Sequence, residues 1–129
     1  MTRSANERVK GKWRITEVEG LESPDINQDE LAHFEFLDDG IGGFCFGGLD
    51  ADVDYLAGEH QRKPAVEFTW EGALFSRELC GRGHAITDGK NHMTGQIWIH
   101  MGEHLFFKAT RWGRWLYDER MKKQKSEQP

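Results

Sequence analysis

The sequence is poor in the residues and motifs that mark most sites of chemistry. It holds two cysteines and three prolines, and neither Cys45 nor Cys80 lies in a spacing typical of a zinc site. No glycine-rich loop stands between a strand and a helix, as phosphate binding requires. Ser76 lacks the Gly-x-Ser-x-Gly turn of serine hydrolases. We therefore expect reduced thiols, no metal and no cofactor.

Long apolar runs are also absent, so the sequence predicts no membrane-spanning helix. The first residues lack the apolar centre of a signal peptide, which predicts a cytoplasmic protein. The net charge of −5 is unevenly spread, because residues 1–60 carry 5 basic and 14 acidic residues and residues 61–129 carry 12 and 8. Phosphate contact needs a clustered cationic face, so this distribution disfavours a nucleic-acid partner.

Glycine and aromatic residues are abundant, at 15 residues and 12%. Turn signals recur about every ten residues, and the alternation of apolar and polar residues between them predicts half-buried strands. With strands near 42–47 and 82–87, the sequence predicts an all-β, eight-stranded, antiparallel up-and-down barrel, because closure leaves no exposed strand edge. A flattened sandwich is the alternative. Seven aromatic residues fall on the predicted inner face: Trp13, Phe34, Phe36, Phe46, Tyr55, Phe68 and Trp70.

Three segments do not have the pattern of strands. Residues 21–31 contain Ser23-Pro24-Asp25, a typical helix start, and predict a short lid helix between the first two strands. Residues 72–81 are predicted to form the longest later connection, and the chain is predicted to turn helical after Trp112. The predicted organisation is an N-terminal extension (1–10), a barrel domain (11–112), and a C-terminal helix with a disordered tail (113–129).

Gly11-Lys12-Trp13, at the start of the first predicted strand, resembles the Gly-x-Trp signature of lipocalins and related calycins. The resemblance implies a calycin-like barrel in which this tryptophan closes one end and an arginine from the last strand packs across it. Arg111, or failing that Arg114, stands where that arginine is expected.

The chain is also similar to a group of uncharacterised small bacterial proteins over roughly residues 11–112. The similarity rests on four segments: Trp13-Arg14-Ile15-Thr16-Glu17, Val66-Glu67-Phe68-Thr69-Trp70-Glu71-Gly72, Gly81-Arg82-Gly83 and Ile97-Trp98-Ile99-His100. That group has no assigned activity, so the similarity implies a fold and a bacterial, cytoplasmic setting.

An eight-stranded barrel is filled by its own side chains or holds one small ligand, and the sequence leaves both open. The first hypothesis is a non-enzymatic protein that binds a small apolar or aromatic molecule inside the barrel. The predicted ligand contacts are Tyr55, Phe68 and Trp70, with Glu67, Arg82 and His100 as polar anchors. The alternatives are an isomerase-type or cyclase-type enzyme with a Glu/His acid–base pair, and an interaction module with a packed barrel.

Two further expectations concern the outer surface. Asp50, Asp52 and Asp54 share one face of a strand, and we expect this face to meet water because the alternate residues make a better core. Trp98 and Phe106 give their strands apolar residues on both faces, so something should cover the outer face there. We expect the C-terminal helix to cover it. A partner copy is the alternative, so the chain is predicted to be a monomer or a homodimer.

Overall fold

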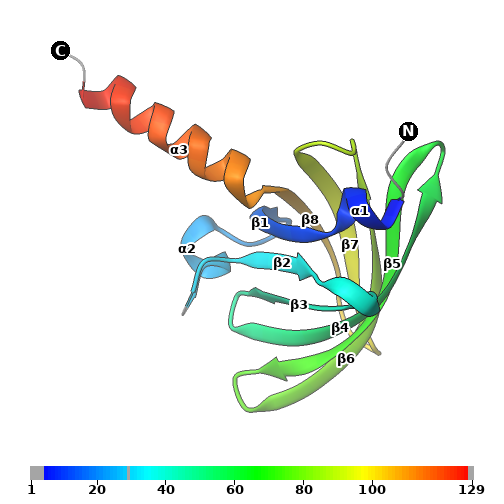
Figure 1. The fold of residues 1–129 in the computed structure, drawn as a ribbon. Coiled ribbons are helices and arrows are strands. Elements are labelled where there is room, and N and C mark those ends of the chain that lie inside the picture. Colours follow the sequence, from blue (N-terminus) through cyan, green and yellow to red (C-terminus); the bar gives the residue numbers. More distant parts are fainter. Residues whose placement is uncertain (1–4, 29, 128–129) are drawn as a thin grey trace.

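The computed structural model describes residues 5–28 and 30–127, which form a closed barrel of eight antiparallel strands in sequential order (Figure 1). The strands are β1 (Gly11–Val18), β2 (His33–Phe36), β3 (Ile41–Phe46), β4 (Leu49–His60), β5 (Lys63–Leu74), β6 (Arg77–Thr87), β7 (His92–Ile99) and β8 (His104–Arg111). The helices are α1 (Ala5–Val9), α2 (Ser23–Ile26), the 3₁₀ turn η1 (Asp38–Gly40) and α3 (Trp112–Glu127). The predicted barrel, with its short helix between the first strands and its C-terminal helix, is confirmed. Within the described residues, the helices are too short or too polar to cross a bilayer.

One predicted loop is instead strand. We expected residues 72–81 to form a long connection, but β5 continues to Leu74 and β6 begins at Arg77. Only Phe75 and Ser76 turn the chain, and Phe75 adopts a positive φ of 57°. The exposed apolar residues of this segment suggested a loop. In the structure Leu74 and Leu79 are half-buried and pack against the core, and Phe75 at the tip of this β-hairpin is 67% exposed.

The buried side chains point into the barrel, as the alternating pattern predicts, and the structure shows that they form one continuous core there. Along β4, buried residues alternate with exposed ones, so Asp50, Asp52 and Asp54 face water. Phe34 lies at the centre of the interior with four aromatic rings around it at centroid distances of 4.5–5.9 Å. The surrounding rings are those of Phe36, Phe44, Phe68 and Phe107. Aromatic pairs at these separations add stability beyond the area they bury.

Glycines on β6 make room for two of the large rings. A Cβ on Gly83 would stand 2.3 Å from Cζ of Phe68, and a Cβ on Gly81 would stand 2.9 Å from Nε1 of Trp70. The same Gly81 Cβ would come within 1.8 Å of the backbone oxygen of Trp98. The rings therefore pack directly on the backbone of the neighbouring strand, which an interior of this width requires.

The end of the barrel next to α1 is closed by a hydrogen-bonded plug. Trp13 is fully buried, and its Nε1–H donates to the Val9 carbonyl at 2.9 Å. The Arg111 guanidinium lies 4.2 Å above the Trp13 ring and donates to the carbonyls of Arg8, Lys10 and Lys90. Of the two arginines that the resemblance allowed, Arg111 is the one in contact with Trp13.

The opposite end is covered by α2. Ile26 is buried there, and its carbonyl accepts a hydrogen bond of 2.7 Å from the Gly47 N–H in the turn between β3 and β4. At the strand ends on this side of the barrel, half-buried aliphatic side chains pack against the core: Leu74, Leu79, Ile99 and Leu105.

Helix α3 does not lie where the sequence predicted. It projects away from the barrel (Figure 1) and contacts mainly β1 and β8 through its first turns, with the Trp112 ring also edge-on to His33 of β2. Trp115 covers the guanidinium of Arg14 at 4.8 Å, and Trp112 lies 4.2 Å from Lys12 Nζ. Both tryptophans thus pack on cationic side chains on the outer face of β1. Because α3 does not reach Phe106, that side chain stays 45% exposed. The expected cover over Trp98 and Phe106 is therefore wrong.

Candidate functional site

The structure divides the six predicted ligand contacts into two groups. Tyr55, Phe68 and Trp70 are 3–4% exposed and lie inside the barrel. The three predicted polar anchors, Glu67, Arg82 and His100, are exposed on the outer face of β5 to β7. The barrel wall separates the groups, so no single cavity brings all six side chains together.

The interior group provides aromatic surface and little polarity. The Tyr55 hydroxyl donates to the Leu37 carbonyl at 2.5 Å, and burial raises the pKa of this phenol. Phe68 contacts Phe34 edge-on at 5.1 Å. Among the described residues the buried polar side chains are Arg14, outside the barrel wall under Trp115, and Thr87, whose hydroxyl donates to the His92 carbonyl. The interior therefore holds no acid–base pair.

Trp70 is the exception in this apolar interior. Its Nε1–H is fully buried and finds no acceptor among the described residues. The ring meets Phe44 edge-on at 5.4 Å, in the half of the barrel nearer α2. Buried N–H groups are nearly always hydrogen-bonded, so such an exception calls for a specific explanation.

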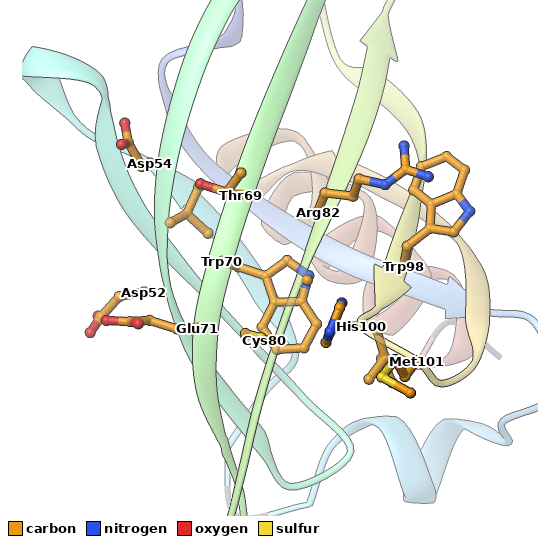
Figure 2. A pocket seen from close by; sticks show the side chains of 13 residues that line it. Asp52, Asp54, Thr69, Trp70, Glu71, Cys80, Arg82, Trp98, His100 and Met101 are labelled. Carbon is orange, nitrogen blue, oxygen red and sulfur yellow. The ribbon is translucent and has the colours of Figure 1, made fainter.

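Two of the polar anchors, Arg82 and His100, line an open groove on the outer face of β4 to β7, with a volume of about 890 Å³ (Figure 2). The third, Glu67, lies outside this groove, beside Leu56 and His84. Strand register places the side chains of the groove in rows across the sheet. One row runs from Asp52 through Glu71 to Cys80, with His100 beyond. The next row runs from Asp54 through Thr69 and Arg82 to Trp98 and His104.

Trp98 is covered by its own row rather than by α3. The guanidinium of Arg82 lies 4.8 Å from the Trp98 ring (Figure 2), and the His104 ring stacks on Trp98 at 4.4 Å with an interplanar angle of 12°. His104 is held by a 2.5 Å hydrogen bond between its Nε2 and Oε1 of Gln96. This stack was not predicted from the sequence, although an outward Trp98 between Ile97 and Ile99 was the signal that could have revealed it.

The groove is electrostatically divided. Asp52, Asp54 and Glu71 form its β4–β5 wall, and Arg82 and His100 lie on the β6–β7 side (Figure 2). Asp52 stands directly opposite Glu71 in the strand register, an arrangement of like charges that destabilises a sheet. The ion pairs found among the described residues involve none of these five side chains.

His84 lies beside this groove, on the outer face of β6, and is expected to titrate below the ordinary histidine value of 6.5. Burial lowers its pKa first, Glu67 raises it, and His60, Arg82 and His104 lower it. The charged form is therefore disfavoured in the folded chain. The stability that this group contributes is complete above pH 6.5 and is lost as the pH falls towards its folded pKa. In an NMR titration, Glu67→Gln should lower the His84 pKa further and Arg82→Gln should raise it. Equal pKa values in all three proteins would contradict this assignment.

Glu67 and His100 lie in different rows, so these two residues do not pair, and Glu67 stands opposite His84 in the strand register. Within the part of the chain that the structure describes, His, Cys, Asp and Glu side chains form no cluster suited to a metal ion. Comparisons of the chain with protein-family models, with curated proteins and with solved structures found no match.

Proposed function

We propose that this protein is a non-enzymatic binding protein that takes up a small aromatic or apolar molecule at the α2 end of the barrel. The observation that carries the proposal is the buried Nε1–H of Trp70, which has no acceptor among the described residues. Leaving such a donor unsatisfied costs about 1–3 kcal/mol. A ligand with one carbonyl or similar acceptor would satisfy the donor and place its apolar part among the rings.

The difference between the two barrel ends supports an entry route under α2. At the α1 end, Trp13 and Arg111 tie the chain through hydrogen bonds to backbone carbonyls. At the other end lies a four-residue helix that contacts β1, and aliphatic side chains at the strand ends there are only half-buried. Segments with little buried surface open at the lowest free energy, so a ligand reaches the interior most easily by displacing α2.

The packed interior sets a condition on binding. The rings of Phe44 and Phe46 stack at 5.7 Å between the α2 end of the barrel and the central rings. A bound ligand must therefore occupy space that side chains fill in the free protein. Binding therefore requires α2 to lift and these rings to turn. We expect association well below the usual range of about 10⁵–10⁷ M⁻¹s⁻¹, because a conformational change precedes it.

The test uses prodan, a fluorescent naphthyl ketone whose carbonyl can accept the Trp70 N–H. The proposal predicts a blue-shifted prodan emission and a rise in melting temperature that grows with prodan concentration. Trp70→Phe keeps an aromatic ring but lacks the donor, and it should weaken binding about 3–10-fold. Trp98→Phe is the matched control on the outer face and should leave binding unchanged. Binding that Trp98→Phe weakens and Trp70→Phe does not, or no binding at all, would refute the interior site.

A second candidate function, an interaction module, is favoured by a separate observation. The interior is filled with rings, whereas the outer face carries an open groove with Trp98 at one side and Leu56, 78% exposed, near its edge. An open groove buries too little of a small molecule for tight binding. Tryptophan and arginine are the residues enriched at the centres of protein interfaces.

A further inference from the structure

We propose that the molecule bound in the barrel is an elongated cation, with an apolar or aromatic body that enters the interior and a charged amine that stays at the α2 end. This ligand class rests on the proposed function, because the interior site beside Trp70 must exist for the charge of its occupant to matter. Three features support a cation: the carboxylates around the α2 end, the apolar side chains exposed between them, and the distance from Trp70 to this end.

Four segments meet at the α2 end, because the connections of an up-and-down barrel lie alternately at its two ends. The connection that carries α2 is joined there by the turns after β3, β5 and β7 (Figure 1). The Gly47 N–H donates to the Ile26 carbonyl of α2. The Phe75 ring lies against Gly48, where an added Cβ would stand 2.7 Å from its Cζ. We call these segments the α2 rim, which comprises residues 19–28, 30–32, 47–50, 75–78 and 100–103.

The α2 rim is acidic. Its one lysine or arginine is Arg77. Against it stand seven exposed carboxylates: Glu19, Glu22, Asp25, Glu30, Asp50, Glu78 and Glu103. The ion pairs found in the described part of the chain include none of the seven. Charges of one sign around an opening into an apolar interior raise the local concentration of ligands of the opposite charge, so this end attracts cations and repels anions.

The α1 end differs from the α2 rim in both charge and pairing. Its exposed residues include four acids and four bases: Asp38, Asp39, Glu59 and Asp88, with Lys10, Arg62, Lys63 and Lys90. Lys10 pairs with Asp38 at 2.5 Å, and Asp88 accepts hydrogen bonds from backbone N–H groups of the turn that follows it. The unbalanced negative charge therefore lies at the end where we expect the ligand to enter.

Exposed apolar side chains lie between these carboxylates. Leu21 is 40% exposed, Phe75 67% and Met101 95%. A ligand with an apolar body covers such side chains, whereas a small hydrated cation leaves them in water. An ammonium group over the exposed Phe75 ring also gains a cation–π contact. The mixture of apolar and acidic side chains thus favours an amphipathic cation over a simple one.

The position of Trp70 sets the length of the ligand. Trp70 stands four residues before Leu74, the last residue of β5, which corresponds to about 13 Å along the strand. A ligand that accepts the Trp70 N–H and places its charge at the α2 rim must span about this distance. The acceptor and the amine therefore belong at opposite ends of an elongated molecule.

The experiment compares prodan with two charged analogues, in which a 2-(trimethylammonio)ethyl or a carboxymethyl group replaces one N-methyl group of its amine. In both analogues the added charge and the ketone lie at opposite ends of the naphthalene. Fluorescence titration should show that the cationic analogue binds about 3–10-fold more tightly than prodan and that the anionic analogue binds more weakly. The difference should shrink as salt increases, because salt screens exposed charges.

Two double variants locate the charges responsible. Glu22→Gln with Asp25→Asn removes two carboxylates of the α2 rim and should reduce the preference for the cationic analogue over prodan. Asp39→Asn with Glu59→Gln changes the net charge equally at the α1 end and should leave the preference unchanged. Should the first pair fail to fold by circular dichroism, Glu78→Gln with Glu103→Gln takes its place and should act in the same direction.

The outcomes separate the ligand class from the interior site. Equal binding of the three probes, or tightest binding of the anionic one, refutes the cationic ligand and leaves the interior site standing. A preference that both double variants reduce equally reports only the net charge and refutes it as well. Binding of the cationic analogue that Trp70→Phe leaves unchanged would place that probe on the outer surface, which also refutes it. If none of the three probes binds, both proposals are refuted.

Discussion

Replacing Trp13 with alanine should lower the free energy of unfolding by about 3–5 kcal/mol, the range for a large aromatic side chain removed from a core. Trp13 is fully buried, so the substitution leaves a cavity at the α1 end. It also removes the donor to the Val9 carbonyl and the ring beneath Arg111. Chemical denaturation followed by circular dichroism measures the change.

Two further variants separate the contributions at this end. Trp13→Phe keeps a ring under Arg111 but loses the hydrogen bond to Val9, and it should cost less than the alanine variant. Trp112→Ala removes a half-buried tryptophan from the outer surface, where a cation–π contact contributes about 0.5–1 kcal/mol. A loss below about 1 kcal/mol for Trp13→Ala would show that Trp13 is not a plug, since exposed substitutions fall in that range.

Gly81→Ala should destabilise the barrel by more than about 3 kcal/mol, beyond the usual cost of overpacking a core. The new Cβ would meet the backbone oxygen of Trp98 at 1.8 Å and Nε1 of Trp70 at 2.9 Å. A rigid backbone oxygen cannot move away as a flexible side chain can, so β6 and β7 must separate. Thermal and chemical unfolding measure the loss.

Gly58→Ala is the matched control for this prediction. Gly58 lies on β4 of the same barrel, and a Cβ there meets nothing within 4 Å. The alanine restricts the unfolded chain, so the variant should be neutral or gain up to about 1 kcal/mol. Equal costs at Gly58 and Gly81 would show that strand propensity, and not the close approach to Trp98, governs both positions.

The barrel was predictable because its determinants are local. Alternation such as Val66, Phe68 and Trp70 against Glu67 and Thr69 has a period of two, and strand geometry converts that period directly into an inside and an outside. Short connections then leave few topologies for neighbouring strands. The lid helix was predictable for the same reason, since its starting residues act on the adjacent backbone.

The placement of α3 was not predictable from its own residues. Trp112 and Trp115 indicated that the helix docks, but equally apolar targets existed on β7 and β8. The structure places them against Lys12 and Arg14 of β1. Trp98 needs no helix because Arg82 and His104 already cover it. Where α3 docks depends on which side chains the strand register brings together, and the register is a property of the assembled sheet.

The candidate sites likewise combine features that are predictable from the local sequence with features that depend on the assembled barrel. The period of each strand already predicts which residues face the interior and which face water, without reference to the other strands. The excess of acidic residues in the first half of the chain is likewise a property of the sequence. That Trp70 packs on Gly81 with its N–H unsatisfied, and that Asp52 stands opposite Glu71 on the outer face, follows only from the folded barrel. These features join residues of different strands, and such contacts exist only after the strands pair and the barrel closes.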